Sequence, residues 1–335
     1  MTAGMSRRAF LGMSGLAGLA LLSACSGGNA SSSASQVASS GSAKGVSLVV
    51  GTLATEDLLP LWVAQAKSLF DKAGVNAKIV PFQSATELIA GVASGEVNMA
   101  MTDIMVTASM FASGVDVQME WVTLGATPDQ GRFGIMVGPN STITSLNDLA
   151  GVPIGVGSNT ILEYVMDKLM EGAGVPDNQI VVEELQKLPV RYQAMASGEV
   201  AAAALPGTLL ALGEASGCKL VADDTKGENL SQSVMIARAD LLALEDGKKQ
   251  VETLKGVWDE AVALVNADPE SYREVLIENA NLPVEIADTY PISVYPTVQL
   301  PTSAMVNPVL EWMNKKGYLT QQLSYDEKTG VFSAR

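Results

Sequence analysis

Residues 46–82 read VSLVVGTLATEDLLPLWVAQAKSLFDKAGVNAKIVPF, and the order of apolar runs in this stretch decides the fold class. The short apolar run at 46–51 predicts a strand, and the amphipathic stretch at 58–73 predicts a helix that ends at Gly74. The run at 77–82 then predicts a second strand. Strands that alternate with helices indicate parallel β-α-β units, so we expect an α/β protein rather than an all-α or all-β one.

The same alternation continues to residue 124 and returns in the same order between residues 152 and 222. The string ASGEV stands at 93–97 in the first copy and at 196–200 in the second. Each glycine falls where a helix is expected to end, so convergence on similar helix caps is one explanation of the repeat. Because the order of elements repeats as well, we favour two lobes with one topology.

Two extended apolar runs, at 132–138 and 233–238, predict the strands on which the chain crosses from one lobe to the other. The first lobe is then expected to contain residues 46–130, and the second to contain residues 131–238 with a hinge strand at each end. Residues 239–335 show mainly helical periodicity and are expected to pack back on the first lobe.

The N-terminal residues carry the features of an export signal. Arg7 and Arg8 precede a short apolar run at 16–22, and a membrane-spanning helix would need about 20 apolar residues. We therefore predict that residues 1–24 are a signal peptide. The run SRRAFL at 6–11 resembles a twin-arginine export signal, and an ordinary secretory signal is the alternative.

The sequence LSAC directly after this apolar run resembles the lipobox of bacterial lipoproteins, which implies that Cys25 becomes the lipidated N-terminus. Two or more acyl chains anchor a protein stably, whereas one does not. Residues 25–45 are mostly Ser, Gly and Ala, a composition that predicts a flexible tether. Cys218 is the other cysteine, so lipidation of Cys25 leaves no pair for an intramolecular disulfide.

Charge and composition narrow the function classes. The formal net charge of −15 disfavours a nucleic-acid partner, which requires a basic surface, and favours a soluble monomer. The chain has no histidine, which is the commonest general base and metal ligand. We therefore expect no catalytic residues, no metal and no cofactor, and a binding protein rather than an enzyme.

Several runs carry a resemblance to a known family. These are GTLATEDLLPLWVA at 51–64, LFDKAGV at 69–75, VPFQS at 80–84, SLNDLAG at 145–151, LPVR at 188–191 and LPG at 205–207. Together they are similar to the nitrate/sulfonate/taurine-type substrate-binding proteins of ABC importers. The resemblance implies a type II periplasmic-binding-protein fold, in which two α/β lobes with mainly parallel sheets are joined by two hinge strands and close over a ligand. It also implies an ABC transporter permease and its ATPase as partners.

Open α/β sheets bind ligands beyond the carboxyl ends of their strands, and the pattern places these ends. The residues expected at the cleft are Leu53, Ala54, Thr55, Asp57, Gln83, Ser84, Thr102 and Asp103 in the first lobe, Ser158, Asn159, Thr160, Gln186, Leu205, Pro206 and Gly207 in the second, and Arg132 at the first crossing.

Each polar candidate has a second, purely structural interpretation. Ser158, Asn159 and Thr160 either cap the following helix or present its N–H groups to a bound anion. Arg132 either pairs with an acidic group of the ligand or forms a salt bridge between lobes. Asp57 and other aspartates at strand ends either accept hydrogen bonds from the ligand or favour a helix N-terminus by their charge.

The identity of the ligand stays open at this point. The resemblance favours an alkanesulfonate or a similar small anion. Asp57, Asp103 and Glu163 against the single cation Arg132 keep a neutral or amine-bearing heterocycle, such as a thiamine-precursor pyrimidine, as the alternative. We expect a protein anchored by lipid to the outer face of the cell membrane that delivers its ligand to an importer, with a ligand-sensing subunit of the same fold as the other reading.

Overall fold

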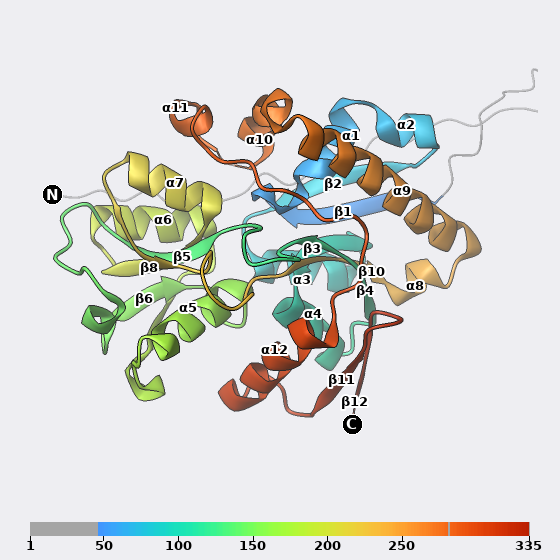
Figure 1. Ribbon diagram of the computed structural model, residues 1–335. Coiled ribbons are helices and arrows are strands. Elements are labelled where there is room, and N and C mark those ends of the chain that lie inside the picture. Colours follow the sequence, from blue (N-terminus) through green and yellow to red (C-terminus); the bar gives the residue numbers. More distant parts are fainter. Residues whose placement is uncertain (1–45, 281, 335) are drawn as a thin grey trace, which may run out of the picture. The chain divides into compact units, whose positions relative to one another are not determined.

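The computed structural model describes residues 46–280 and 282–334, which belong to one compact unit (Figure 1). The predicted signal peptide, Cys25 and the tether lie outside the described residues. None of the helices in the described ranges combines the length and the apolar character that crossing a membrane would require.

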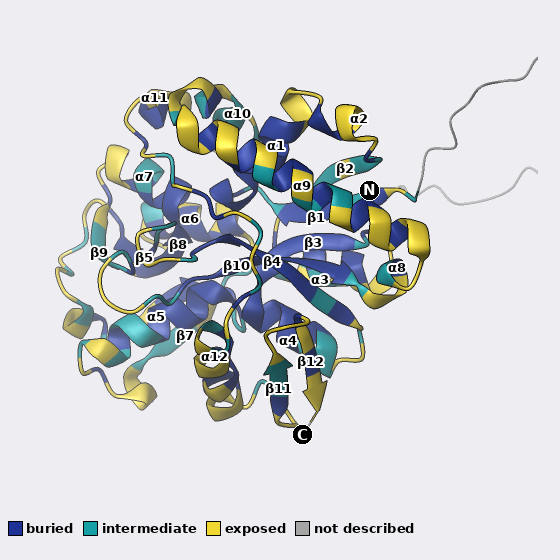
Figure 2. Ribbon diagram, turned by 45° about the vertical axis from the view of Figure 1, so that its right-hand side comes forward, coloured by how far each residue is buried: buried dark blue, intermediate teal, exposed yellow. Residues whose placement is uncertain are grey.

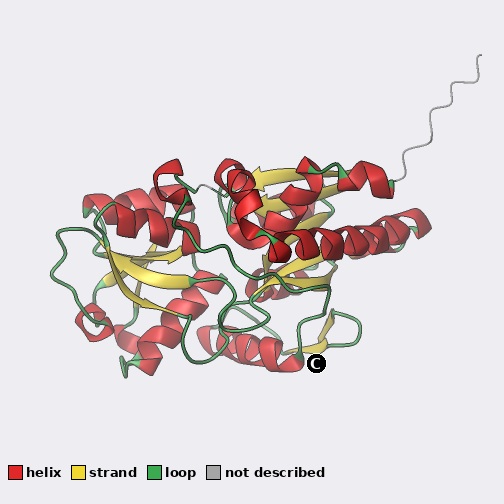
Figure 3. Cartoon of the chain, turned by 45° about the horizontal axis from the view of Figure 1, so that its top comes forward, coloured by secondary structure: helices red, strands yellow, loops and turns green. Residues whose placement is uncertain are grey.

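The unit contains two five-stranded sheets, one in each lobe, with helices on both faces (Figure 3). The spatial order of the first sheet is β2 (Ala77–Phe82), β1 (Leu48–Leu53), β3 (Met99–Asp103), β10 (Ser233–Arg238) and β4 (Val117–Leu124). The order of the second is β7 (Val181–Glu184), β6 (Pro153–Val156), β8 (Ala202–Pro206), β5 (Phe133–Val137) and β9 (Lys219–Asp223). In each sheet four strands share one direction and the fourth in the order opposes them. The predicted α/β class, with two mainly parallel sheets of one topology, is confirmed.

Side chains of the first sheet alternate between two apolar layers because successive residues of a strand point to opposite faces. Met99 and Met101 pack into the layer under the long helix α9 (Glu245–Ala267), whereas Ala100 packs into the layer on the other face. The first layer contains Trp121 and Trp258, whose ring centroids lie 5.7 Å apart. Figure 2 shows that α9 exposes its outer face and buries its inner one.

The helices of the first lobe that precede the crossing are η1 (Glu56–Leu58), α1 (Leu59–Ala66), α2 (Leu69–Ala73), α3 (Ala85–Ser94) and α4 (Ile104–Ala112). The second lobe contributes η2 (Leu146–Leu149), α5 (Ile161–Gly172), η3 (Asp177–Gln179), α6 (Leu188–Ser197) and α7 (Gly207–Ala215). The C-terminal part contains α8 (Ala239–Leu242), α9 (Glu245–Ala267), η4 (Pro269–Tyr272), α10 (Arg273–Asn279), α11 (Val284–Ala287), α12 (Ser303–Lys316), β11 (Leu323–Asp326) and β12 (Val331–Ala334).

The repeated ASGEV strings end helices in the same way, as expected. Gly95 follows α3 with a φ of 78°, and Gly198 follows α6 with a φ of 80°. This left-handed conformation costs glycine little, because glycine has no Cβ. The two glycines therefore stop the matching helices of the two lobes.

The two strands predicted to cross between the lobes lie within sheets instead. β5 pairs with β8 and β9 in the second sheet, and β10 pairs with β3 and β4 in the first. The chain crosses in the irregular segments 125–132 and 224–232. These segments contact each other, since Asn229 Nδ2 donates to the carbonyl oxygen of Gly125 at 2.9 Å. A fully buried strand and a crossing strand give the same apolar run in a sequence, so the pattern did not distinguish them.

Two further segments differ from the predicted pattern. The helix expected at 58–73 is divided into η1, α1 and α2, with Ser68 at a φ of 55° before the last piece. The C-terminal part, expected to be helical, also contains the antiparallel hairpin of β11 and β12. That hairpin reaches the edge of the first sheet, where the Met119 N–H donates to the carbonyl oxygen of Gly330 at 2.9 Å.

Candidate functional site

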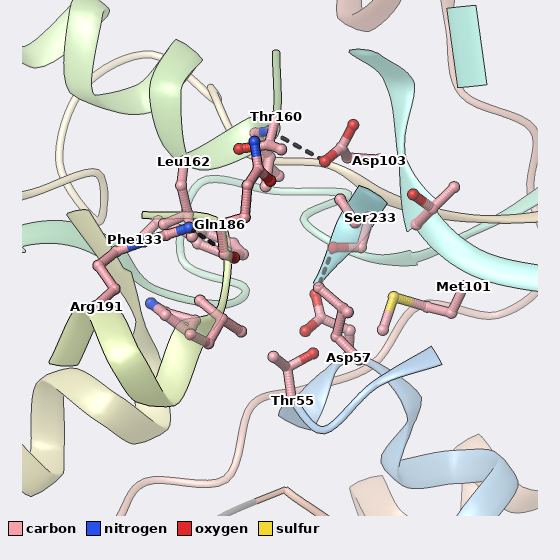
Figure 4. A pocket seen from close by; sticks show the side chains of 16 residues that line it. Thr55, Asp57, Met101, Asp103, Phe133, Thr160, Leu162, Gln186, Arg191 and Ser233 are labelled. Atoms are coloured by element: carbon pink, nitrogen blue, oxygen red, sulfur yellow. Dashed lines mark hydrogen bonds between the residues drawn. The ribbon is translucent and has the colours of Figure 1, made fainter. Parts of the chain in front are cut away.

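A cavity lies where the strand ends of the two sheets face each other (Figure 4). Its volume is about 60 Å³. Eight residues predicted from the sequence line it, namely Leu53, Thr55, Asp57, Thr102, Asp103, Thr160, Gln186 and Pro206. They follow or end β1, β3, β6, β7 and β8, so both sheets contribute to the wall.

Asp103 ends β3 and connects the two lobes. Its Oδ1 accepts a hydrogen bond from the N–H of Val106, in the first turn of α4, at 2.7 Å. Its Oδ2 accepts one from the N–H of Ile161, the first residue of α5 in the other lobe, at 3.0 Å. Burial raises the pKa of Asp103 to about 6, although these N–H groups act in the opposite direction. One carboxylate therefore satisfies helix N-termini from both lobes.

Glu56 and Asp57 follow β1 and are both buried. Asp57 accepts a hydrogen bond from the hydroxyl of Ser233, at the start of β10. Glu56 accepts one from the hydroxyl of Tyr290. Burial, reinforced by the charge of Asp57, raises the pKa of Glu56 to about 8. Glu56, which lies beside the cavity rather than in its wall, is therefore mostly protonated at neutral pH.

Arg191 on α6 is the cation of the cavity wall, and it is 2% exposed. Its Nε donates to the carbonyl oxygen of Leu185 at 2.8 Å, and its Nη1 donates to that of Ala204 at 3.0 Å. Its Nη2 donates to the carbonyl oxygen of Gln186 at 3.2 Å (Figure 4). Burial lowers the pKa of Arg191 to about 10, so the guanidinium is still charged at neutral pH.

Arg132, the cation predicted for the site, does not line this cavity. Its Nε donates to Asp223 at 2.8 Å, and its Nη1 and Nη2 donate to the two carboxylate oxygens of Glu214 at 3.1 and 3.0 Å. Both acids belong to the second lobe, so the salt bridge lies within that lobe rather than between lobes. The structure therefore favours the structural interpretation of Arg132.

Gln83 and Ser84 belong to the start of α3 rather than to the cavity wall. The hydroxyl of Ser84 accepts a hydrogen bond from the N–H of Glu87 at 3.2 Å, and the N–H of Gln83 donates to the carboxylate of Glu87 at 3.1 Å. This reciprocal arrangement stabilises the first turn of a helix. The neighbouring Ala85, which the sequence analysis did not select, does line the cavity.

In the predicted run 158–160, Thr160 reaches the cavity, whereas the other two side chains bind elsewhere. The hydroxyl of Ser158 donates to the carboxylate of Glu184. Asn159 adopts a φ of 59°, and its Nδ2 donates to the hydroxyl of Ser109 in the first lobe at 2.7 Å. Asn159 therefore contributes to the contact between the lobes.

The remaining predicted residues also lie outside the cavity wall. Ala54 follows β1, and Leu205 is buried within β8. Gly207 begins α7, and a Cβ placed there would lie 2.6 Å from Glu56 Oε1 and 2.7 Å from the Tyr290 hydroxyl. Only a residue without a side chain lets this pair approach the helix so closely.

Eight lining residues were missed by the sequence analysis. They are Ala85, Met101, Phe133, Ile161, Leu162, Leu188, Arg191 and Ser233. Ile161, Leu162 and Leu188 lie in the first turn of a helix that follows a strand, so the wall of the cavity extends one helical turn past the strand ends. Ser233 begins the antiparallel strand β10 and reaches the cavity because that strand runs in the opposite direction.

A second contact between the lobes lies outside the cavity, between α5 and α12. The Nζ of Lys316 lies 2.9 Å from the carboxylate of Glu163 and 3.0 Å from that of Asp167. The indole N–H of Trp312 donates to Asp167 at 2.8 Å, and the hydroxyl of Tyr318 donates to Glu163. Glu163, an acid considered for the cleft, is therefore part of this contact. We call the contact between α5 and α12 the lobe seam.

Residues 55–271 match the family described as NMT1/THI5 like. The chain belongs to this family. The matched region begins at Thr55 in the cavity wall and includes α5 and α6, so this NMT1/THI5-like region supplies walls of the cavity from both lobes.

Solved structures share the fold of this NMT1/THI5-like protein at low sequence identity. The alkanesulfonate-binding protein SsuA from Xanthomonas axonopodis pv. citri superposes with a TM-score of 0.70 at 18% identity, covering 84% of this chain and 96% of that one. The periplasmic aliphatic sulphonate binding protein SsuA from Escherichia coli gives 0.69 at 16% identity, covering 86% and 92%. The desulfurization enzyme DSZB gives 0.60 at 15% identity, covering 82% and 94%. Among curated proteins, no relative matches the sequence.

These similarities confirm the predicted family resemblance and the periplasmic-binding-protein fold. At such identities the structures establish the fold alone, and the fold accommodates both binding proteins and an enzyme. Whether this NMT1/THI5-like chain binds or converts a ligand therefore depends on the residues of its own cavity.

Proposed function

We propose that the protein is an extracytoplasmic solute-binding protein that captures a small organic molecule between its lobes and delivers it to an ABC importer. The observation that carries this proposal is the cavity between the strand ends of two lobes of one topology. Cavities at this position are where open α/β sheets bind ligands. The sulfonate-binding proteins of the same fold support a small organic anion as the ligand.

The wall of the cavity suits binding better than catalysis. Thr55, Thr160 and Gln186 offer neutral polar groups for a ligand, whereas Asp103 is already held by N–H groups of both lobes. The chain also lacks histidine, the side chain that most often transfers protons at neutral pH. We therefore propose a receptor that releases its ligand unchanged.

Closure of the lobes is part of this proposal. The hydrogen bond from Ile161 to Asp103 and that from Asn159 to Ser109 each join one lobe to the other. Such contacts exist only while the lobes are together, so a ligand that bridges the same walls would shift the population toward the closed form.

Native mass spectrometry of the protein purified from its source, followed by uptake assays with the co-purified molecule, tests the proposal. We expect one small molecule bound per chain, and a strain lacking the protein should accumulate less of that molecule. Normal uptake in that strain, with a changed transcriptional response to the molecule, would favour the ligand-sensing subunit. Conversion of the bound molecule into a product by the purified protein would establish an enzyme.

We also propose that Cys25 carries the lipid anchor, on the strength of the LSAC sequence that ends there. A Cys25→Ser variant should lose incorporation of labelled fatty acid and move from the membrane fraction to the soluble fraction. Cys218→Ser is the matched control, because Cys218 is a buried thiol in the folded part. Retention of the Cys25→Ser variant in the membrane fraction would argue against the anchor.

A further inference from the structure

The buried guanidinium of Arg191 is held only by neutral groups. Three of its five N–H groups donate to backbone carbonyl oxygens, those of Leu185, Gln186 and Ala204. Among the described residues no carboxylate lies within ion-pair distance of Arg191. Glu184 acts on it through its charge, but that carboxylate accepts hydrogen bonds from Ser158 and Gln186. A buried charge without a counter-ion is costly, so a bound anion would be stabilised here.

The acids of the opposite wall already have donors within the protein. Asp103 accepts N–H groups from α4 and α5, and Asp57 accepts the hydroxyl of Ser233. These carboxylates therefore already accept hydrogen bonds within the protein, whereas two N–H groups of Arg191 have no protein acceptor.

The start of α5 is not free to bind an anion in this conformation. Its first N–H group, that of Ile161, donates to Asp103 across the lobes. The hydroxyl of Thr160, which precedes it, donates to the carbonyl oxygen of Gly157 at 2.7 Å. The carboxylate of Asp103 thus occupies the N-terminus of α5, where an anion was predicted, whereas Arg191 keeps two N–H groups without a protein acceptor.

The size of the cavity limits the ligand. One water molecule requires at least about 10 to 15 Å³ of cavity volume, and this cavity has about 60 Å³. A ligand group that fits here in this conformation is therefore small. Thr55 and Gln186 add neutral hydrogen-bonding groups, and Phe133 and Leu162 add apolar walls.

We propose that Arg191 is the specificity-determining residue of the cleft and that its guanidinium pairs with the acidic group of a small monoanion, a sulfonate or a carboxylate. The two N–H groups of Arg191 that carry no protein acceptor would donate to two oxygens of that group. Arg191 carries one positive charge, and Asp57 lies on the facing wall. A ligand with one negative charge is therefore better balanced than a ligand with two. This inference rests on the solute-binding function proposed above, and it assigns to Arg191 the role predicted for Arg132.

Three probes of equal size and different charge test the assignment. They are methanesulfonate, the neutral methanesulfonamide and the cation methylguanidinium, each with five non-hydrogen atoms. Isothermal titration calorimetry should show that methanesulfonate binds at least about tenfold more tightly than methanesulfonamide, as expected of charge-assisted hydrogen bonds. Methylguanidinium should bind most weakly. Equal binding of the three probes, or binding by none of them, would overturn the inference.

Variants separate recognition by Arg191 from its structural role. Arg191→Met should abolish the preference for methanesulfonate over methanesulfonamide, whereas Arg191→Lys should retain part of it because the charge remains. If Arg191 were purely structural, its loss would weaken the binding of all three probes alike and leave the preference for methanesulfonate unchanged. Arg132→Met is the matched control and should keep the wild-type preference, because its partners are Glu214 and Asp223.

Asp57→Asn provides a second route if the Arg191 variants do not fold. Removing this negative charge from the facing wall should strengthen the binding of methanesulfonate severalfold and leave the binding of methanesulfonamide unchanged. Unchanged binding of methanesulfonate would contradict the inference. The solute-binding function would survive such a result if a native ligand co-purifies, so the two proposals fail separately.

Discussion

The Oδ2 atom of Asp103 lies 3.0 Å from the backbone nitrogen of Ile161, so a carboxylate at a strand end of one lobe caps a helix of the other. The same side chain caps α4 through Val106. Replacing Asp103 with alanine removes both caps, and one cap contributes about 1 kcal/mol, within a range of about 0.5 to 2 kcal/mol. We expect Asp103→Ala to lower the free energy of unfolding by about 2 kcal/mol, within a range of about 1 to 4 kcal/mol, measured by urea denaturation.

Ser84→Ala is the matched control for this prediction. Ser84 also stands between a strand and a helix, but its hydroxyl caps α3 alone. Its loss should cost about 1 kcal/mol. If the two variants lose equal stability, the contact between Asp103 and Ile161 does not hold the lobes together.

The sequence predicted the two sheets because strand and helix periodicities differ and because glycines punctuate both copies. Gly95 and Gly198 end matching helices in the observed fold. The roles of β5 and β10 were not predictable, since an antiparallel strand buried on both faces has the same apolar pattern as a parallel one. The hairpin of β11 and β12 was missed because each strand has four residues and buries only one of them fully.

The sequence predicted those residues of the candidate site that directly follow a strand, but not those further along the chain. Polar residues directly after a parallel strand, such as Asp57 and Thr160, do reach the cavity. Arg191 lies in the first turns of α6, and its side chain returns toward β8 to bind the carbonyl of Ala204. Arg132 stands closer to a strand end, but Glu214 and Asp223 hold it elsewhere. Partners distant in the sequence decide which arginine faces the cavity.

The raised pKa of Glu56 predicts a pH dependence of stability. Its ordinary value of 4.5 rises to about 8 in the folded protein, chiefly through burial. Between these values the folded chain holds one more proton than the unfolded chain, so the free energy of unfolding falls as pH rises. The slope is at most about 1.4 kcal/mol per pH unit. Glu56→Gln should remove it, as measured by chemical denaturation between about pH 6.5 and about pH 8.

The pH range of this experiment keeps other acids from interfering. Asp103 and Asp224 titrate with a pKa of about 6, and their contributions are largely complete above that value. Glu87→Gln is the control, because Lys187 and the N–H of Gln83 lower the pKa of Glu87 and its contribution is lost only on acidification. A slope that persists in Glu56→Gln would assign the pH dependence to another group.

The lobe seam predicts different roles for two adjacent lysines of α12. Lys316 pairs with Glu163 and Asp167, whose side chains are 1% and 5% exposed. Lys316→Met leaves two buried carboxylates without a cation, and we expect a loss of about 3 to 5 kcal/mol. Lys315 is 55% exposed and pairs with Asp177 and Glu171, which are 59% and 27% exposed. Lys315→Met should cost no more than about 1 kcal/mol.

Urea denaturation of the two lysine variants checks this difference. The double variant Lys316→Met with Asp167→Asn should regain part of the stability, because one of the uncompensated charges is removed. Equal losses in the two single variants would mean that the seam is open in solution.

Substitution by alanine should affect stability very differently at two glycines, Gly207 and Gly172. An alanine Cβ there would lie 2.6 Å from Glu56 Oε1 and 2.7 Å from the Tyr290 hydroxyl, and both side chains are buried. Overpacking of this kind costs about 1 to 3 kcal/mol. Gly172, the last residue of α5, would meet no atom within 4 Å. Gly172→Ala should therefore be neutral or stabilise the protein by up to about 1 kcal/mol.

Thermal denaturation of the two glycine variants, with Gly207→Ala combined with Tyr290→Phe as a third, separates the contacts at α7. Removing the Tyr290 hydroxyl takes away one of the two close approaches, so the double variant should regain part of the loss. The contact with Glu56 remains, so recovery should be incomplete. Gly207→Ala with wild-type stability would mean that Glu56 and Tyr290 do not pack against α7, and that other contacts such as that of Asp103 and the lobe seam hold the first lobe to the second.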